Sequence, residues 1–141
     1  MPAIEVLIVD DIGSVRAILR NLLISLEVKP HEISEAADGG DAIALLETRP
    51  FDFVITDWNM PEASGIDVLK RVRARSEKTP VLLLTSNNHR EEVIGAVEAG
   101  ANDYILKPFS QATLSRKISF WLNVARDVGE DNRSNADDGR P

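Results

Sequence analysis

The sequence contains no cysteine and few aromatic residues, which make up 5% of the chain. The lack of cysteine excludes disulfides, thiolate nucleophiles and cysteine-ligated zinc sites. Basic residues are also scarce, because 16 Lys and Arg stand against 23 Asp and Glu and give a net charge of -7. Contacts to nucleic-acid phosphates need a surplus of Lys and Arg. We therefore expect no nucleic-acid partner.

Long apolar runs are absent as well. No run approaches the roughly 18–20 residues that cross a bilayer. The start, Met-Pro-Ala-Ile-Glu, lacks the basic and apolar regions of a signal peptide. The sequence thus predicts no membrane insertion and a cytoplasmic location. Its 141 residues, 43% of them hydrophobic, suit one compact unit with a core of its own.

Short apolar runs alternate with segments of helical periodicity along most of the chain. We expect strands at residues 4–9, 32–36, 53–56, 81–84 and 104–106, each followed by a helix. The first helix should bury Val15, Ile18, Leu19, Leu22 and Leu26, and the last should bury Leu114, Ile118, Trp121, Leu122 and Ala125. This alternation predicts an α/β fold, a doubly wound five-stranded parallel sheet with helices on both faces.

The composition of the strands and of the C-terminal segment refines this picture. Residues 4–9, 53–56 and 81–84 are the most continuously apolar and should be central, whereas 32–36 mixes polar and apolar residues and suits an edge. Residues 127–141 have almost nothing to bury. We therefore predict a domain over residues 1–126 and a flexible acidic tail over 127–141.

Polar residues follow four of the expected strands at the edge where open parallel sheets bind ligands, outside the carboxyl ends of the strands. They are Asp10 and Asp11 after the first strand, Asp57 after the third, Thr85 and Ser86 after the fourth, and Lys107 after the fifth.

Three converging carboxylates require a cation, because two of them 4 Å apart repel by about 4 kcal/mol at an effective dielectric near 20. Ligands that are all oxygen, beside a phosphoryl group, favour Mg2+. Lys107 can supply positive charge to that group and Thr85 a hydroxyl hydrogen bond. Asp57 is then the candidate nucleophile, since a carboxylate forms an acyl phosphate directly.

Four motifs identify a resemblance. They are Val9-Asp10-Asp11, Asp57-Trp58-Asn59-Met60-Pro61 with Gly65, Leu84-Thr85-Ser86, and Lys107-Pro108-Phe109. Over residues 4–125 the chain resembles the receiver domains of bacterial response regulators, in particular the single-domain chemotaxis regulators of the CheY type. The resemblance implies a flavodoxin-like, CheY-like sheet with strand order 2-1-3-4-5.

The resemblance also implies roles for single residues. Asp57 accepts phosphate from a histidine kinase or a histidine phosphotransfer protein. Asp11 and Asp57 ligate Mg2+ with the backbone carbonyl of Asn59, and Asp10 acts through the waters of the metal. The phosphoryl oxygens are held by Thr85 and by Lys107, which precedes a cis peptide bond to Pro108. Ser86 belongs to the same phosphate-binding set, and its small side chain leaves a path to the phosphoryl group. Asn59 and Asn87 tune the hydrolysis of that group.

The output side follows from the same resemblance. Thr85 and Tyr104 form a two-state switch, and Phe120 with Arg90, Lys117 and Tyr104 forms the face that binds a downstream protein, for which the flagellar motor switch is a candidate. Helical spacing places Phe120 off the core face of the last helix. Phe120 replaces a basic residue and Asn87 an acidic one that we expect in chemotaxis relatives.

Several functions compete for this sequence. The first is a stand-alone switch that is no enzyme beyond autocatalytic phosphorylation and autodephosphorylation. The alternative is a phosphorelay intermediate or phosphate sink without an output of its own. A free-standing phosphatase would want an Asp-x-Asp pair, whereas Asp10 and Asp11 are adjacent. A flavin module would need a Gly-rich or Ser-rich phosphate loop at the same place. His31 and His89 lack metal-ligand spacing and are expected at the surface.

Overall fold

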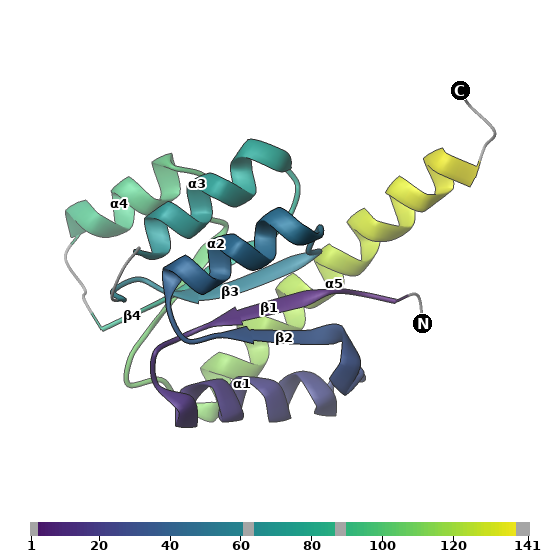
Figure 1. The fold of residues 1–141 in the computed structure, drawn as a ribbon. Helices are drawn as coiled ribbons and strands as arrows, with labels where there is room; N and C mark the ends of the chain where they lie inside the picture. Colours follow the sequence, from purple (N-terminus) through teal and green to yellow (C-terminus); the bar gives the residue numbers. More distant parts are fainter. Residues whose placement is uncertain (1–2, 61–63, 87–89, 138–141) are drawn as a thin grey trace.

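The computed structural model describes residues 3–60, 64–86 and 90–137, and for residues 90–92 and 129–137 it describes the backbone only. Strands and helices alternate along this part of the chain (Figure 1). The strands are β1 Val6–Val9, β2 Ile33–Ala36, β3 Phe53–Asp57, β4 Val81–Thr85 and β5 Asp103–Leu106. The helices are α1 Gly13–Ser25, α2 Gly39–Thr48, α3 Gly65–Arg75, α4 Arg90–Glu98 and α5 Gln111–Asp137, with a short 3-10 helix at Pro30–Glu32.

The five strands form one parallel sheet with the order β2-β1-β3-β4-β5. This confirms the predicted strand order. It also confirms that the strand after residue 32 lies at an edge and that the three most apolar strands lie inside the sheet. Because helices cover both faces, the inner strands are buried on both sides and have continuous apolar sequences.

Two hydrophobic clusters fill the space on either side of the sheet. Val6 and Ile8 of β1 pack with residues of α1 and α5, whereas Leu7 and Val9 pack with residues of α2 and α3. This alternation is the period of two that a strand imposes on its side chains. Figure 1 shows the same layers, with α1 and α5 on one side of the sheet and α2, α3 and α4 on the other.

Most residues of the predicted core stripes pack into the core, but Val15 and Leu26 of α1 are only partly buried. In α5, Leu114, Ile118, Leu122 and Ala125 are buried, while Trp121 is only partly buried at the edge of the cluster. In α1, Ile18 is 41% exposed, and the prediction that it joins the core is wrong. Ile18 lies about 100° around the helix from Leu19, whereas Leu23 lies only about 40° from it and is the residue buried instead.

The C-terminal segment, which we expect to be a flexible acidic tail, begins as a continuation of the last helix. Helix α5 runs on to Asp137, and in Figure 1 its end projects away from the sheet and the other helices. A helix that is already formed adds each further residue without a new nucleation step, so a polar segment can continue it. The flexibility of this segment and the boundary at residue 126 remain predictions. No described helix is long and apolar enough to span a membrane.

Candidate functional site

An acidic cluster lies at the carboxyl ends of β1 and β3. Asp10, Asp11 and Asp57 each place a carboxylate oxygen within 4.8 Å of the others. The strand register brings Asp10 and Asp57 together, because Val9 of β1 pairs with Thr56 of β3 and an aspartate follows each of these two residues in the chain. Asp10 and Asp57 are buried and Asp11 is exposed. Such a set of oxygen ligands suits a hard divalent cation such as Mg2+.

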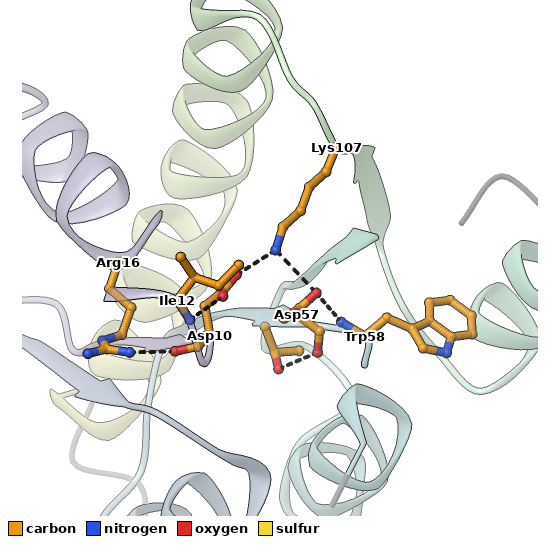
Figure 2. A network of polar contacts seen from close by, with 7 residues as sticks. Asp10, Ile12, Arg16, Asp57, Trp58 and Lys107 are labelled. Carbon is orange, nitrogen blue, oxygen red and sulfur yellow. Dashed lines mark hydrogen bonds and ion pairs between the residues drawn. The ribbon is translucent and has the colours of Figure 1, made fainter. Parts of the chain in front are cut away.

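Lys107 provides positive charge to two of these carboxylates. Its Nζ lies 2.9 Å from Asp10 Oδ2 and 3.5 Å from Asp57 Oδ1 (Figure 2). The backbone N–H of Lys107 donates to Thr85 O at 2.7 Å, which ties the end of β5 to the end of β4. Burial alone would lower the pKa of Lys107, but the hydrogen bond to Asp10 and the charges of Asp10 and Asp57 raise it. The side chain is therefore a fixed cation at neutral pH.

Asp57 is held in an environment that disfavours its charge. Burial, followed by the charge of Asp10, raises the pKa of Asp57, and Lys107 only partly opposes this. Asp57 Oδ1 accepts a hydrogen bond from Trp58 N at 2.9 Å. The carboxylate is thus oriented by the backbone and left with unfavourable electrostatic energy that a bound cation would reduce.

Helix α3 packs closely against the end of β3. Gly65 N donates to Trp58 O at 2.8 Å, and a Cβ at Gly65 would meet the backbone of Asp57 and would lie 2.9 Å from Trp58 Cα. Ser64 caps the helix, since its Oγ accepts from Asp67 N at 3.3 Å while Asp67 Oδ2 accepts from Ser64 N at 3.0 Å. Any side chain at position 65 would clash with the backbone of Asp57 and Trp58, so the motif requires glycine there.

The other residues predicted for the site at the carboxyl ends of the strands differ in burial. Thr85 ends β4 and is buried, one residue beyond Leu84, which pairs with Asp57. Ser86 and Asn59 are exposed. The Lys107–Pro108 bond is cis, which confirms that prediction. Asn87 lies outside the described residues, as do His89 and the side chain of Arg90, whereas His31 is exposed in the 3-10 helix before β2.

The predicted output residues lie around β5 and α5. Phe120 is 58% exposed, as helical spacing predicts, and its ring packs edge-on against Trp121 with centroids 4.9 Å apart. Tyr104 is partly buried, and Lys117 Nζ lies 5.1 Å from the centre of its ring. Lys117 Nζ also donates to Tyr104 O at 2.7 Å.

Sequence reasoning missed two residues in these regions. The carboxylate of Asp103 accepts from Trp121 Nε1 at 3.0 Å, Lys117 Nζ at 3.0 Å and Tyr104 N at 2.8 Å. Burial would raise the pKa of Asp103, but these hydrogen bonds outweigh burial and lower it. The other residue is Arg16, whose Nη1 donates to Asp10 O at 2.6 Å (Figure 2). A charged residue at the start of an apolar strand was the available signal for Asp103, whereas nothing in the sequence pointed to Arg16.

Known families and proteins resemble this chain closely. The family model of the response regulator receiver domain matches residues 6–119. The chemotaxis protein CheY-3 of Vibrio cholerae is 47% identical over 116 residues, which cover 81% of this chain and 88% of that protein. The chemotaxis protein CheY of Pseudomonas aeruginosa is 44% identical over 116 residues, which cover 81% of this chain and 92% of that protein.

Solved structures give the same result. The chemotaxis response regulator CheY4 of Vibrio cholerae is 32% identical with a TM-score of 0.75, and the match covers 85% of this chain and 99% of that one. The receiver domain of a sensor histidine kinase from Pseudomonas aeruginosa is 27% identical with a TM-score of 0.72, covering 86% of this chain and 99% of that one. That structure holds a magnesium ion in its active site cleft.

Proposed function

The chain belongs to the family of response regulator receiver domains, and on that premise we propose that it is a phosphorylation switch that accepts a phosphoryl group on Asp57 with Mg2+ bound beside it. The observation that carries the proposal is the position of Asp57 between an excess of carboxylates and one fixed ammonium, Lys107. CheY-like receivers are generally not conventional enzymes, and we expect only autocatalytic phosphorylation and dephosphorylation here.

The residues fit the metal that the family implies. Asp11 and Asp57 would hold Mg2+ directly with the carbonyl of Asn59, and Asp10 would bind its waters. When bound, Mg2+ neutralises negative charge on the transferring phosphoryl oxygens. The fit rests on the three carboxylates that converge within 4.8 Å. Burial and then the charge of Asp10 raise the pKa of Asp57, so a bound cation would favour its ionised form.

The chain's own residues then perform the transfer. A carboxylate oxygen of Asp57 forms a bond to phosphorus as the phosphorus–nitrogen bond of a phosphohistidine breaks, and the electron pair leaves with the imidazole. Lys107 lies close enough to Asp57 to contact the incoming oxygens, and we assign the hydroxyl of Thr85 the same role. Ser86 leaves the approach open, and Asn59 and Asn87 tune the attack of water that ends the signal.

Phosphorylation by a small-molecule donor tests this proposal. Incubation with acetyl phosphate and Mg2+ should add one phosphoryl group, located at Asp57 by mass spectrometry of the intact protein and its peptides. Asp57→Asn should abolish the modification. The matched control is Asp52→Asn, because Asp52 accepts from Glu5 N at the other end of β3. Modification of the Asp57→Asn protein at the parent's rate would contradict the assignment.

We further propose that the signal leaves through the face of Tyr104, Lys117 and Phe120, together with Arg90. Thr85 and Tyr104 are the two-state element that couples this face to Asp57. The donor is a histidine kinase or histidine phosphotransfer protein, and the likeness to chemotaxis proteins makes the flagellar motor switch the target to test first. We propose that this exchange takes place in the cytoplasm, and the likeness to chemotaxis proteins supports this.

The output face is tested by capture of an immobilised motor-switch peptide in the presence of beryllofluoride. Phe120→Ala and Tyr104→Ala should reduce capture and leave phosphorylation of Asp57 unchanged. Unchanged capture in both variants would remove this face from the proposal. Transfer of the phosphoryl group to a second histidine protein, without any capture, would favour the phosphorelay alternative.

A further inference from the structure

Every polar atom of Asp10 has a hydrogen-bond partner, and each partner comes from a different segment. The backbone N–H donates to Ala36 O at 3.1 Å. Oδ1 accepts from Ile12 N at 2.9 Å and Oδ2 from Lys107 Nζ at 2.9 Å. The carbonyl oxygen accepts from Arg16 Nη1 at 2.6 Å (Figure 2). Three of these contacts involve the end of a strand or the adjoining loop, and the fourth comes from a side chain of α1.

Arg16 links the acidic loop to β2. While Nη1 binds the Asp10 carbonyl, Nε lies 3.3 Å from Glu35 Oε1. Glu35 belongs to β2, where it pairs with Ile8 of β1. The planar guanidinium presents several donors in a fixed geometry, so one side chain can hold both groups at once. Arg16 is 23% exposed and is therefore partly shielded from water.

The Asp10 carbonyl matters because it belongs to the peptide plane that joins Asp10 to Asp11. A peptide unit is rigid, so holding its oxygen also fixes the direction in which the chain leaves toward Asp11. Asp11 lies outside any helix or strand and its side chain is exposed, so helix or sheet hydrogen bonding does not orient it. The contact from Arg16 is thus suited to keep the Asp11 carboxylate beside those of Asp10 and Asp57.

We propose that Arg16 is a positioning residue for the acidic cluster, and that its hydrogen bond to the Asp10 carbonyl sets the affinity for Mg2+. This inference rests on the proposed function, because it assumes that Mg2+ binds there. Charge and geometry give opposite expectations. Removal of a positive charge near an acidic cluster tightens cation binding on charge alone, whereas loss of the positioning contact weakens it. Glu35, which Arg16 shares with Arg20, offsets part of the Arg16 charge, and water screens the rest, so the geometric effect should dominate.

Arg20 offers a matched control. Its Nη1 lies 3.5 Å from Glu35 Oε2, so it has the same charge, the same helix and the same acidic partner as Arg16. Of these two described arginines, Arg16 is the one whose side chain donates to the Asp10 carbonyl. Arg16→Met and Arg20→Met each remove one positive charge and the donors while keeping an apolar stem of similar length. Arg16→Lys keeps the charge but loses the planar fork.

The experiment is calorimetric titration of each full-length variant with MgCl2, followed by acetyl phosphate phosphorylation over a range of Mg2+ concentrations. Arg16→Met should weaken Mg2+ binding by about 10-fold, as is typical for partners that orient metal ligands. Arg16→Lys should show a smaller loss, and Arg20→Met should bind as the parent does. The half-saturating Mg2+ for phosphorylation should rise for Arg16→Met while the rate at saturating Mg2+ stays within about twofold of the parent.

Each outcome decides the matter. Mg2+ binding by Arg16→Met that equals or exceeds the parent's would overturn the inference and leave the proposed function intact. An equal loss in Arg20→Met would overturn it too, because that loss would come from the shared partner Glu35. Failure of the parent itself to bind Mg2+ would overturn both. If Arg16→Met does not fold, as judged by circular dichroism, Arg16→Lys decides: a loss of affinity supports the inference and parental affinity overturns it.

Discussion

Lys107 and Lys117 each contact aspartate near β5, but their surroundings differ. Lys107 faces Asp10 and Asp57 beside a third carboxylate, Asp11, so negative charge is in excess. Lys117 faces Asp103 alone, and this carboxylate also accepts hydrogen bonds from Trp121 Nε1 and Tyr104 N. The pKa of Asp57 is raised and that of Asp103 is lowered. The same pair of residue types thus forms an acidic cluster that could hold a cation in one case and a hydrogen-bonded structural network in the other.

The largest expected effect comes from replacing Lys107, the positive side chain beside the acidic cluster. Lys107→Met should lower the free energy of unfolding in EDTA by about 3 kcal/mol, because it leaves buried carboxylates without their counterion. Mg2+ should then stabilise this variant at least as much as the parent, since it supplies the missing positive charge. Urea unfolding with and without Mg2+ measures both effects. A variant as stable as the parent in EDTA would contradict the view that Lys107 offsets this charge.

Weakening the hydrogen-bond network of Asp103 should lower the free energy of unfolding by a smaller amount, and this decrease should not depend on the metal. Asp103→Asn keeps an acceptor oxygen but loses the charge that pairs with Lys117, and the free energy of unfolding should fall by about 1–2 kcal/mol. The decrease should be the same in EDTA and in Mg2+, because Asp103 is not part of the acidic cluster. The change in Trp121 fluorescence on unfolding is a convenient probe. A decrease that Mg2+ reversed would show that the two regions are coupled.

Neutralising the phosphoacceptor should act in the opposite direction. A raised folded-state pKa means that the ionised Asp57 carboxylate disfavours folding at neutral pH. Asp57→Asn should therefore raise the free energy of unfolding in EDTA by up to about 1 kcal/mol, while it abolishes the stabilisation by Mg2+. The same urea experiment measures this. A clear loss of stability in EDTA would indicate that the attraction of Lys107 outweighs the burial of the Asp57 charge and its repulsion from Asp10.

The smallest effect concerns how the contribution of Asp103 to the free energy of unfolding depends on pH. The folded-state pKa of Asp103 is lowered, so its contribution to stability is fully present above the unfolded value of about 3.9 and is lost as pH falls through the folded value. The difference in unfolding free energy between the parent and Asp103→Asn should stay constant from neutral pH to about 5 and shrink below about 4. A difference that changed near pH 7 would point to another group.

The sequence by itself determined the alternation of strands and helices, the central and edge strands, and the ends of the strands at which acidic and basic residues gather. A strand with a continuous apolar sequence is buried on both faces and therefore lies inside the sheet. Parallel strands bring their carboxyl ends to one edge of the sheet, so Asp10, Asp57 and Lys107 could be expected there. The exposure of Phe120 followed from helical spacing in the same way.

The tertiary structure decided what depends on contacts between distant segments. Whether Ile18 or Leu23 of α1 meets the sheet depends on how the helix is rotated on it, and a periodic pattern fixes that rotation only to within about one residue. Asp103 becomes a structural acceptor because α5 brings Lys117 and Trp121 over β5. Arg16 lies in the first turn of α1, six residues after Asp10, and its side chain reaches back to the Asp10 carbonyl (Figure 2). A hydrogen bond to a backbone oxygen leaves no trace in residue types, so only the folded chain could show this contact.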